Sequence, residues 1–374
     1  MADHGAPRVD LVDPAAYTPP YDHALAAALA GEGARVRLVT GPFAHGDVPV
    51  VAGAASYAVE ERFYRWSPPG RVRPFARLAQ HVPDMLRYHR AAASGADVVH
   101  FQWLPVQPVD VHLLPSGRPR VLTAHDVLPR EAGARRRDAQ RRLYERMDAV
   151  VVHSEHGRRR LVDLGIDPAR VEVIPHGAFT HLTALPHQVP LPPHLAAVTK
   201  PVVLFFGLLR PYKGLDVLLE AWRAFGADPP AELWIVGNPR GVTLPSPLPP
   251  GVRAEPRFVA DAEIPALFRR ADLVVLPYRE IDQSGVLFTA LAFGKPLVLS
   301  DVGGFPEVAA HGAAALVPAG DAPALHTTLA TLLHDPARRA ALASASAQAA
   351  SDHYAWPTIA AKHLALYHRL LAAR

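Results

Sequence analysis

The sequence predicts an α/β protein made of two doubly wound domains that face each other across a cleft. Its 374 residues exceed what one hydrophobic core usually holds. Short apolar runs alternate with helical stretches, and this alternation occurs twice along the chain, on either side of a proline-rich segment. Strands that alternate with helices form parallel sheets with helices packed against both faces, which is the physical basis of this expectation.

The first series, in residues 1–183, contains apolar runs of the length that buried parallel strands have. The expected strands are Val9–Val12, Val36–Thr40, Val98–Phe101, Val121–Ala124 and Val150–His153. Helical stretches lie between them at Tyr21–Ala30 and Arg135–Met147.

Residues 184–200 are rich in proline and show no periodicity, so we expect a semi-rigid interdomain linker there. The second domain, residues 201–352, restarts with a strand and then a helix at Leu215–Phe225. Its expected strands are Val202–Gly207, Leu233–Val236, Leu273–Leu276 and Leu297–Leu299. The tail, residues 353–374, contains an amphipathic helix at Trp356–Leu371.

Composition excludes several classes of function. Hydrophobic residues make up 49% and charged residues 20%, as in ordinary globular proteins. Cysteine is absent, which excludes disulfides and thiolate chemistry. The N-terminus lacks a signal pattern and no apolar run is long enough to span a membrane, so a cytoplasmic location is expected. A net charge of +4 is too weak to indicate nucleic acid as a partner.

The segment Arg62–Arg90 is strongly basic and interleaved with aromatic residues. Its cations outnumber its single acidic residue, Asp84. One interpretation is an ordinary solvated basic face. The other is a surface for an acidic acceptor or for an anionic membrane, at whose inner face the protein binds peripherally. The residues concerned are Arg62, Phe63, Tyr64, Arg65, Trp66, Arg71, Arg73, Phe75, Arg77, Arg87, Tyr88 and Arg90.

Two cations follow the first strand of the second domain, in the run FFGLLRPYKG. The strand ends near Gly207, and a helix begins soon after Gly214. Arg210 and Lys213 are therefore expected at the carboxyl edge of the sheet, where ligands bind. Cations there neutralise a diphosphate and stabilise it as a leaving group. The alternative is a solvated pair at a helix start.

A second anion site is expected where a helix begins after the strand Leu273–Leu276. Gln283 and Ser284 precede Gly285, which permits close approach of the backbone to a ligand. The N–H groups of Gly285 and Val286 are then placed to hold a phosphate. The alternative is an ordinary helix start in which Ser284 is the N-cap.

The chain resembles the family 4 glycosyltransferases, which are retaining enzymes of the GT-B fold that use nucleotide-sugar donors. The resemblance rests on VVLFFGLLRPYKGLDVLLEAW, LWIVG, ADLVVLPYRE and FGKPLVLSDVGGFPEV in the second half, in the family's order. The first half matches through DVVHFQW, VLTAHD, VVHSE and VIPHG.

The resemblance implies roles for individual residues. Arg210 and Lys213 match the family's phosphate-binding pair, with Lys213 the closer match. His125 matches an active-site histidine near the transferred sugar. His176 occupies a hinge position often filled by asparagine, where a structural role is expected. His100 and His153 are expected to be strand-end histidines rather than ligands.

The chain also departs from the family's pattern. Many members carry two glutamates with seven residues between them, and the corresponding residues here are Ile281 and Thr289. Glu307 either compensates or stabilises its turn. The residues expected to bind the donor are Gly207, Arg210, Lys213, Asp282, Gln283, Ser284, Gly285, Val286 and Glu307.

The family's paired glycines after the first strand are replaced here by a stiff aromatic loop, residues 17–23. We therefore expect Tyr21 and His23, together with His125, to shape the acceptor side.

The resemblance implies a retaining glycosyltransferase whose first domain presents the acceptor and whose second domain binds a nucleoside-diphosphate sugar. The tail helix is expected to return to the first domain. No metal and no cofactor are expected, because cations and a helix terminus take over charge neutralisation. The alternatives are a nucleotide-sugar-binding protein without activity, and another GT-B enzyme such as a nucleotide-sugar epimerase.

Overall fold

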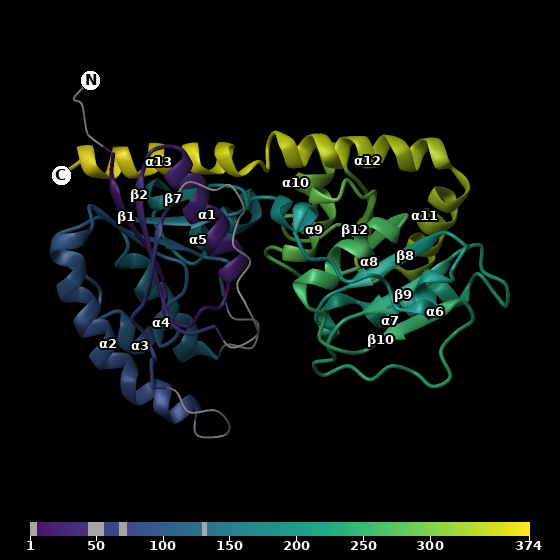
Figure 1. Cartoon of the computed structure of the whole chain (residues 1–374), viewed down its shortest axis with the longest axis horizontal. Helices are drawn as coiled ribbons and strands as arrows, with labels where there is room; N and C mark the ends of the chain where they lie inside the picture. Colours follow the sequence, from purple (N-terminus) through teal and green to yellow (C-terminus); the bar gives the residue numbers. More distant parts are fainter. Residues whose placement is uncertain (1–5, 44–55, 67–72, 129–132) are drawn as a thin grey trace. The chain divides into compact units, whose positions relative to one another are not determined.

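The computed structural model of the chain describes residues 6–43, 56–66, 73–128 and 133–374. The chain forms two compact units (Figure 1), the first made of Met1–Gly177 with Trp356–Arg374 and the second of Ala178–Ala355. Each unit is a parallel sheet between layers of helices. The prediction of two Rossmann-like doubly wound domains is confirmed.

The first unit contains a seven-stranded sheet in the order β3-β2-β1-β4-β5-β6-β7, and every neighbouring pair is parallel. The central strand β1 pairs with β2 on one side and β4 on the other, so the direction of winding reverses between β1 and β4. The strands are β1 Arg8–Asp13, β2 Arg35–Thr40, β3 Ala58–Glu61, β4 Val98–Phe101, β5 Arg120–Thr123, β6 Ala149–Val152 and β7 Val171–Val173.

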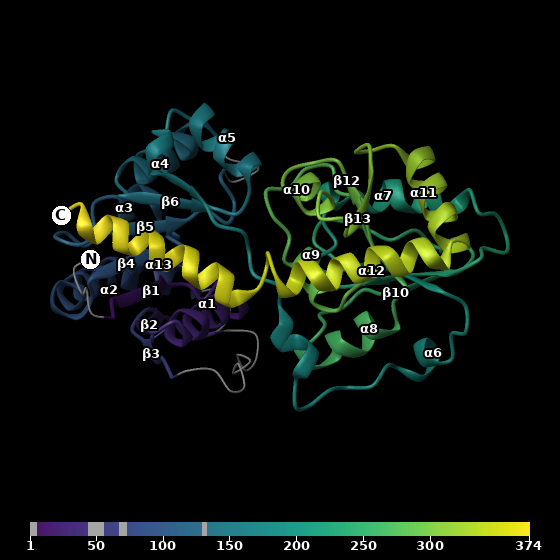
Figure 2. The same cartoon turned by 90° about the horizontal axis from the view of Figure 1, so that it is seen from above.

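Helices cover both faces of this sheet (Figure 1). They are α1 Pro19–Gly31, α2 Arg73–Gly95, α3 Gln107–Asp110, α4 Ala134–Glu145, α5 Glu155–Asp163 and α13 Trp356–Ala372. The C-terminal helix α13 packs beside α1 and runs across the sheet (Figure 2). It is bonded to β4, because the Tyr367 hydroxyl lies 2.7 Å from Nδ1 of His100, whose Nε2 lies 2.8 Å from the Thr123 hydroxyl.

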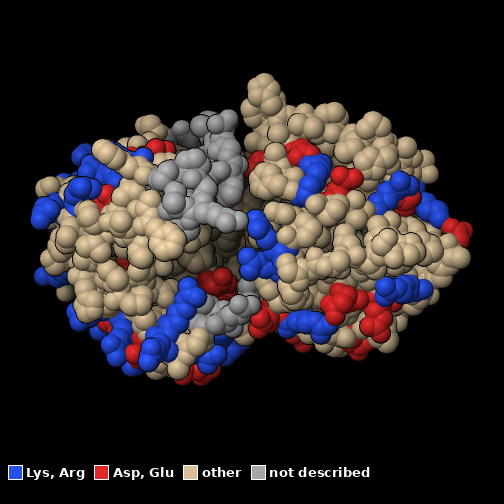
Figure 3. All heavy atoms as spheres, turned by 90° about the horizontal axis from the view of Figure 1, so that it is seen from below, with Lys and Arg blue, Asp and Glu red and all other residues tan. Residues whose placement is uncertain are grey.

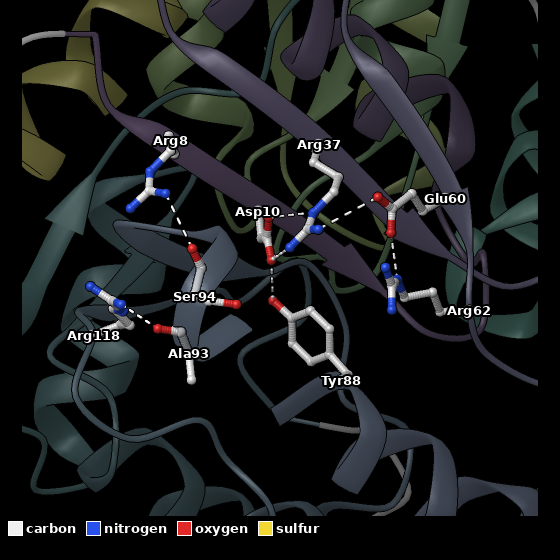
Figure 4. A network of polar contacts seen from close by, with 9 residues as sticks. All are labelled: Arg8, Asp10, Arg37, Glu60, Arg62, Tyr88, Ala93, Ser94 and Arg118. Atoms are coloured by element: carbon white, nitrogen blue, oxygen red, sulfur yellow. Dashed lines mark hydrogen bonds and ion pairs between the residues drawn. The ribbon is translucent and has the colours of Figure 1, made fainter. Parts of the chain in front are cut away.

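Polar contacts attach α2 to the opposite face of the sheet (Figure 4). The carboxylate of Asp10 on β1 is buried and accepts two hydrogen bonds from Arg37, at 2.9 and 2.8 Å. Tyr88 of α2 donates its hydroxyl to the same carboxylate at 3.0 Å. Near the end of α2, the carbonyl of Ser94 accepts from Arg8 at 3.2 Å. This half of α2 is therefore anchored by charge-assisted bonds as well as by packing.

The second unit contains a six-stranded parallel sheet in the order β10-β9-β8-β11-β12-β13. Its winding reverses between β8 and β11. The strands are β8 Val202–Phe206, β9 Glu232–Val236, β10 Val252–Glu255, β11 Leu273–Leu276, β12 Leu297–Ser300 and β13 Ala314–Val317.

The helices of this unit pack in two layers, with α11 against α7 and α12 against α9. They are α6 Pro193–Ala196, α7 Leu215–Arg223, α8 Ile264–Arg270, α9 Gly285–Ala292, α10 Phe305–Ala309, α11 Ala322–His334 and α12 Pro336–Ser351.

The structure corrects the expected linker. Residues 184–200 belong to the second unit, and the division falls between Gly177 and Ala178. Within this segment α6 forms, and Leu195 and Val198 are buried in the core of the second unit. Proline removes backbone donors but does not prevent its apolar neighbours from packing, so a proline-rich composition alone does not identify a linker.

In the part of the chain that the structure describes, no helix combines the length and the apolar character that crossing a membrane requires.

Candidate active site

The loops at the carboxyl edge of the second sheet lie where its winding reverses, which is where ligands bind in open α/β sheets. One loop, residues 207–214, follows β8, and the other, residues 277–284, follows β11. Most residues predicted from the sequence to bind the donor lie on these two loops.

Three glycines allow these loops and their neighbours to approach one another closely. A methyl group on Gly214 would lie 1.9 Å from the carbonyl oxygen of Pro277, and one on Gly303 would lie 1.7 Å from that of Ile281. A methyl group on Gly237 would lie 1.8 Å from the carbonyl oxygen of Gly207. These approaches are far below van der Waals contact, so the architecture of this edge requires glycine.

Lys213 is the buried cation of the site. It ends a short 3-10 turn, Pro211–Lys213, and only 6% of it is exposed. Its Nζ lies 5.1 Å from the centre of the Tyr278 ring, within cation–π range. A methyl group on Gly207 would lie 3.2 Å from Nζ and 3.0 Å from a methyl of Val286. The structure thus brings together Gly207, Lys213 and Val286, as predicted.

Val286, in the first turn of α9, and the Lys213 ammonium both lie beside Gly207. Ser284 is the N-cap residue, yet among the described residues its hydroxyl caps no N–H of that turn. Asp282 and Ser284 are buried, whereas Gly285, the first residue of the helix, is exposed. A helix N-terminus with a lysine nearby has the electrostatics of a phosphate site. The interpretation of Ser284 as an ordinary side-chain cap is therefore not supported.

Arg210 is placed differently from Lys213. It is exposed and lines a pocket of about 540 Å³ with Tyr212, Asp216 and Arg279. Arg279 is paired with Asp216 at 2.5 Å. Glu307 is half-buried in the first turn of α10, directly after the Gly303–Gly304 turn.

Ile281 and Thr289, the two positions where the family resemblance leads one to expect glutamates, are apolar or internally bonded here. Ile281 is buried, and its carbonyl is the atom that Gly303 approaches. Thr289 is buried in α9 and donates its hydroxyl to the carbonyl of Gly285 at 3.0 Å. Neither side chain carries a charge to this site.

The first unit has its own cluster at the carboxyl edge of its sheet. His125, His153 and His176 follow β5, β6 and β7 respectively. The buried ring of Tyr21 lies among them, with centroid distances of 4.8 Å to His125, 5.5 Å to His153 and 4.8 Å to His176. The Trp103 indole stacks on His125 at 5.2 Å and 14°.

The histidines of this cluster are neutral near pH 7. Burial, followed by the neighbouring histidines, lowers the pKa of His125 well below its ordinary value. Burial likewise lowers the pKa of His153 to about 4 and that of His176 well below 6.5.

A directional chain of hydrogen bonds fixes which nitrogen of His125 carries the proton. Nδ1 of His153 lies 3.0 Å from the carbonyl of Ile174, which can only accept, so this nitrogen carries the hydrogen. Nε2 of the neutral His153 then accepts from Nδ1 of His125 at 3.2 Å. His125 therefore presents an unprotonated Nε2, which is the form of a general base or hydrogen-bond acceptor.

The Gln102 amide completes this chain. Its oxygen is 3.3 Å from Nε2 of His125, while its buried nitrogen has no partner in the described part of the chain. Turning the amide by 180° lets the nitrogen donate to the Nε2 lone pair and satisfies both groups. Both His125 and Gln102 line a pocket of about 210 Å³ together with Tyr17 and Trp103.

The acceptor-side residues predicted from the sequence divide in the structure. Tyr21 lies beside His125, as above. His23 instead points to another loop, with Nδ1 2.6 Å from the Tyr57 hydroxyl. The loop between β1 and α1 is organised by Asp13, whose carboxylate accepts the N–H groups of Ala15, Tyr17 and Thr18.

Sequence reasoning did not assign Gln102, Trp103, His153 and Trp356 to this cluster. A signal for His153 was present, because His125, His153 and His176 all follow strands of one parallel sheet and so share an edge. The Trp356 ring, 5.3 Å from Tyr21, comes from α13 and carries no comparable local signal. Among the described residues no set of three histidine or acidic side chains is arranged to hold a metal ion.

Two family profiles match the chain. The one described as Glycosyltransferase Family 4 matches residues 21–181. The one described as Glycosyl transferases group 1 matches residues 200–335.

Named proteins with similar sequences are glycosyltransferases. The chain is 28% identical to the GDP-mannose:glycolipid 4-beta-D-mannosyltransferase of Xanthomonas campestris pv. campestris, over 68% of this chain and 77% of that protein. It is 29% identical to the D-inositol 3-phosphate glycosyltransferase of Corynebacterium glutamicum (strain R), over 79% of this chain and 78% of that protein.

Solved structures share the two-unit architecture. The sucrose-phosphate synthase of Thermosynechococcus elongatus superimposes with a TM-score of 0.74 at 19% identity, covering 98% of this chain and 100% of that one. An Anabaena protein in complex with UDP-glucose gives a TM-score of 0.73 at 20% identity, with the same coverage. At these identities the likeness concerns the GT-B fold.

Proposed function

The chain belongs to the family 4 glycosyltransferases, and we propose that it moves a sugar from a nucleoside-diphosphate sugar to an acceptor hydroxyl with retention at the anomeric carbon. Glycosyl transfer follows from the family and from the named relatives. The donor, the stereochemistry and the residue roles are the proposal.

The observation that carries the proposal is the position of the buried Lys213 beside Gly207 and near Val286 of α9, a helix whose first residue, Gly285, is exposed. A lysine ammonium and the N–H groups of a helix N-terminus together favour binding of an anion such as phosphate. A diphosphate fits, because its negative charge increases as the bond to the sugar breaks. Lys213 and the turn from Ser284 to Val286 then stabilise the leaving group.

In the proposed reaction the bond between the anomeric carbon and the diphosphate oxygen breaks as the acceptor oxygen bonds to the same face. The acceptor's proton passes to the departing diphosphate, so atoms and charge balance. Arg210, at the rim of the neighbouring pocket, adds a second positive charge for the donor. Asp282, Gln283 and Glu307 complete the donor side.

The first unit is proposed to present the acceptor. His125 and Gln102 line the pocket that Tyr17 and Trp103 also line, and there a sugar or acceptor hydroxyl takes the place of the Gln102 amide and donates a hydrogen bond to the unprotonated Nε2 of His125. Tyr21 supports the His125 ring by edge-to-face packing. The relatives act on a glycolipid and on inositol 3-phosphate by their names, and we propose an acceptor from these classes.

A thermal-shift panel tests the donor part. UDP, GDP, ADP, UDP-glucose and GDP-mannose are added to the wild-type protein, and a ligand at about 100 times its Kd should stabilise it by about 2.7 kcal/mol. Lys213→Met should weaken donor affinity by about 10- to 100-fold, because a desolvated charge pair with phosphate is lost. The matched control is Lys200→Met, at an exposed lysine paired with Asp228, and it should bind as the wild type does.

Turnover distinguishes the alternatives. Transfer, or slow hydrolysis of the bound donor, supports the proposed enzyme. Tight nucleotide binding without either would favour a binding protein without activity, whose support is the pair Ile281 and Thr289 in place of glutamates. A donor that changes its sugar without any acceptor would favour an epimerase.

A further inference from the structure

We infer that α2 and the turn before it form a docking surface for an anionic lipid membrane. This inference does not depend on the proposed reaction, because it rests on the side chains that α2 exposes. We call the exposed side chains Phe75, Leu78, Val82 and Leu86 the apolar stripe. Arg71 and the side chain of Arg73, which belong to the same basic segment, lie outside the described residues.

The apolar stripe is narrow and continuous along α2. With about 100° between successive residues, its four positions fall within an arc of about 80° on the helix. Phe75 is 76% exposed, and Trp66, in the turn before α2, is 84% exposed. The backbone N–H of Trp66 donates to Oε1 of Gln80 at 3.0 Å, which attaches this turn to the helix. Large side chains exposed together in this way mark an interaction site rather than ordinary surface.

A basic groove of about 700 Å³ runs along α2 on the other side of its exposed surface. Its lining residues include Arg62, Arg65, Trp66, Gln80, Pro83 and Arg87. Arg87 is paired with Asp84 at 2.6 Å, and Arg62 is paired with Glu60. Within the described residues no carboxylate pairs with Arg65 or Arg90, so these two contribute uncompensated positive charge.

The apolar stripe together with the basic groove indicates a membrane as the partner. A membrane surface presents phosphate at one depth and hydrocarbon a few ångströms deeper, and the arginines and the apolar stripe match these two layers. Tryptophan is suited to the boundary between them. Figure 3 shows Lys and Arg residues spread among uncharged residues over the first unit, rather than one uniform charged patch.

Core packing and a hydrogen bond to the sheet anchor α2 beneath this surface (Figure 4). Its buried side contributes Met85 and Tyr88 to the core, and Tyr88 is bonded to Asp10 of β1. The apolar stripe therefore does not need to fold on binding, which reduces the entropic cost of docking.

Vesicle co-sedimentation with the full chain tests the inference. Wild-type protein should bind vesicles with about 30% phosphatidylglycerol and much less to pure phosphatidylcholine, and raising salt from about 0.1 M to about 0.5 M should reduce binding steeply. Leu78→Asn/Val82→Asn should weaken binding by about tenfold or more, because two side chains no longer insert. Arg65→Gln/Arg90→Gln should weaken binding to the anionic vesicles by about tenfold.

Matched control variants come from the second unit. Val189 and Leu316 are 46% and 40% exposed, against 56% for Leu78 and 38% for Val82, so Val189→Asn/Leu316→Asn removes a comparable pair. Arg223→Gln/Arg338→Gln is the charge control, at two exposed arginines. Circular dichroism and thermal unfolding confirm that each variant is folded.

Absence of wild-type binding to anionic vesicles would overturn the inference. So would binding that the α2 variants and their controls weaken equally. If the α2 variants bind vesicles normally but stop the protein from assembling with another protein, the surface is a protein interface and the membrane proposal is wrong.

Discussion

At the scale of single residues, the proton positions on His153 and His125 follow from one backbone carbonyl. Ile174 can only accept, and this fixes the tautomer of His153 and, through it, that of His125. His153 thus determines which nitrogen of His125 carries the hydrogen. Its position after β6 had indicated a strand-end histidine, and the structure shows that such a residue can also determine the state of a neighbour.

Replacing His153 with leucine should remove the acceptor for the Nδ1–H of His125. We expect His125 to lose its single tautomer and the protein to lose about 1–3 kcal/mol of stability, the cost of a buried donor without a partner. Histidine ¹⁵N NMR reports the tautomer directly. His153→Gln, which retains an acceptor, should restore the Nδ1–H form in part. An unchanged His125 spectrum in the leucine variant would contradict the chain of bonds.

At the scale of elements, the loops of the second sheet owe their arrangement to glycine contacts. Gly214 has a φ of +67° and packs against the carbonyl of Pro277. Gly214→Ala should cost about 3 kcal/mol or more, since it combines backbone strain with a clash that the carbonyl cannot escape. Urea unfolding measures this cost.

Gly226→Ala is the control for backbone strain alone. It has a similar φ of +76°, and no described atom lies within 4 Å of the added methyl. It should cost about 1 kcal/mol. If the two variants are equally stable, the close approach of the loops does not contribute to the stability of this edge.

Two helix starts with serine at the N-cap provide another contrast. Ser154 accepts the N–H of Gly157 at 3.1 Å, so Ser154→Ala should cost about 1 kcal/mol. Ser284 makes no such bond among the described residues, so Ser284→Ala should change stability by less than about 0.5 kcal/mol. Thermal unfolding measures both. If Ser284 binds the donor, its variant should also show a smaller thermal shift with nucleotide sugar, and Ser154→Ala should not.

How much of the fold the sequence predicted depends on the kind of element. Buried parallel strands were located well, because runs such as Val98–Phe101 and Leu273–Leu276 are apolar on both faces and appear unchanged as β4 and β11. The helix α2 was not recognised, because arginines and Pro83 interrupt its pattern and its exposed face carries apolar side chains. The hydrophobic periodicity of a sequence does not reveal a helix whose exposed face carries apolar side chains.

The site was predicted in part for a similar reason. Lys213, Gly207 and Val286 lie together because they follow neighbouring strands, and that neighbourhood can be inferred from strand order. The burial of Lys213 and the exposure of Arg210 depend on packing by Tyr278 and on the path of the short 3-10 turn. The spacing of Arg210 and Lys213 in the sequence does not predict which of them is buried.

At the scale of the whole molecule, buried neutral histidines are concentrated in the first unit. Among the described residues, burial lowers the pKa of six histidines there, against one, His181, in the second unit. The six are His23, His100, His125, His153, His176 and His363. The first unit should therefore be the more sensitive to acid.

The sign of this effect follows from proton uptake. The unfolded chain binds protons at its histidines near pH 6.5, whereas folded His153 binds one only near a pKa of about 4. Stability is thus complete above about pH 6.5 and falls as the pH drops toward 4, by about 3 kcal/mol for His153 alone. Hydrogen exchange at about pH 7.5 and about pH 5, corrected for intrinsic rates, should show greater loss of protection in the first sheet than in the second. Equal losses would contradict the expectation.

The path of the backbone between the units has a consequence for how the protein is built. The chain leaves the first unit after Gly177 and re-enters it at Trp356. These two residues are neighbours in space, because a methyl group on Gly177 would overlap the Trp356 ring. Next to them, the Ala178 N–H donates to the carbonyl of Tyr354 at 2.8 Å. The second unit is thus inserted into the sequence of the first, and its two ends lie next to each other. A chain that joins Gly177 directly to Trp356 through a short glycine bridge would retain every strand of the first sheet, so the unit proposed to bind the acceptor can be separated from the unit proposed to bind the nucleotide by excision rather than by truncation.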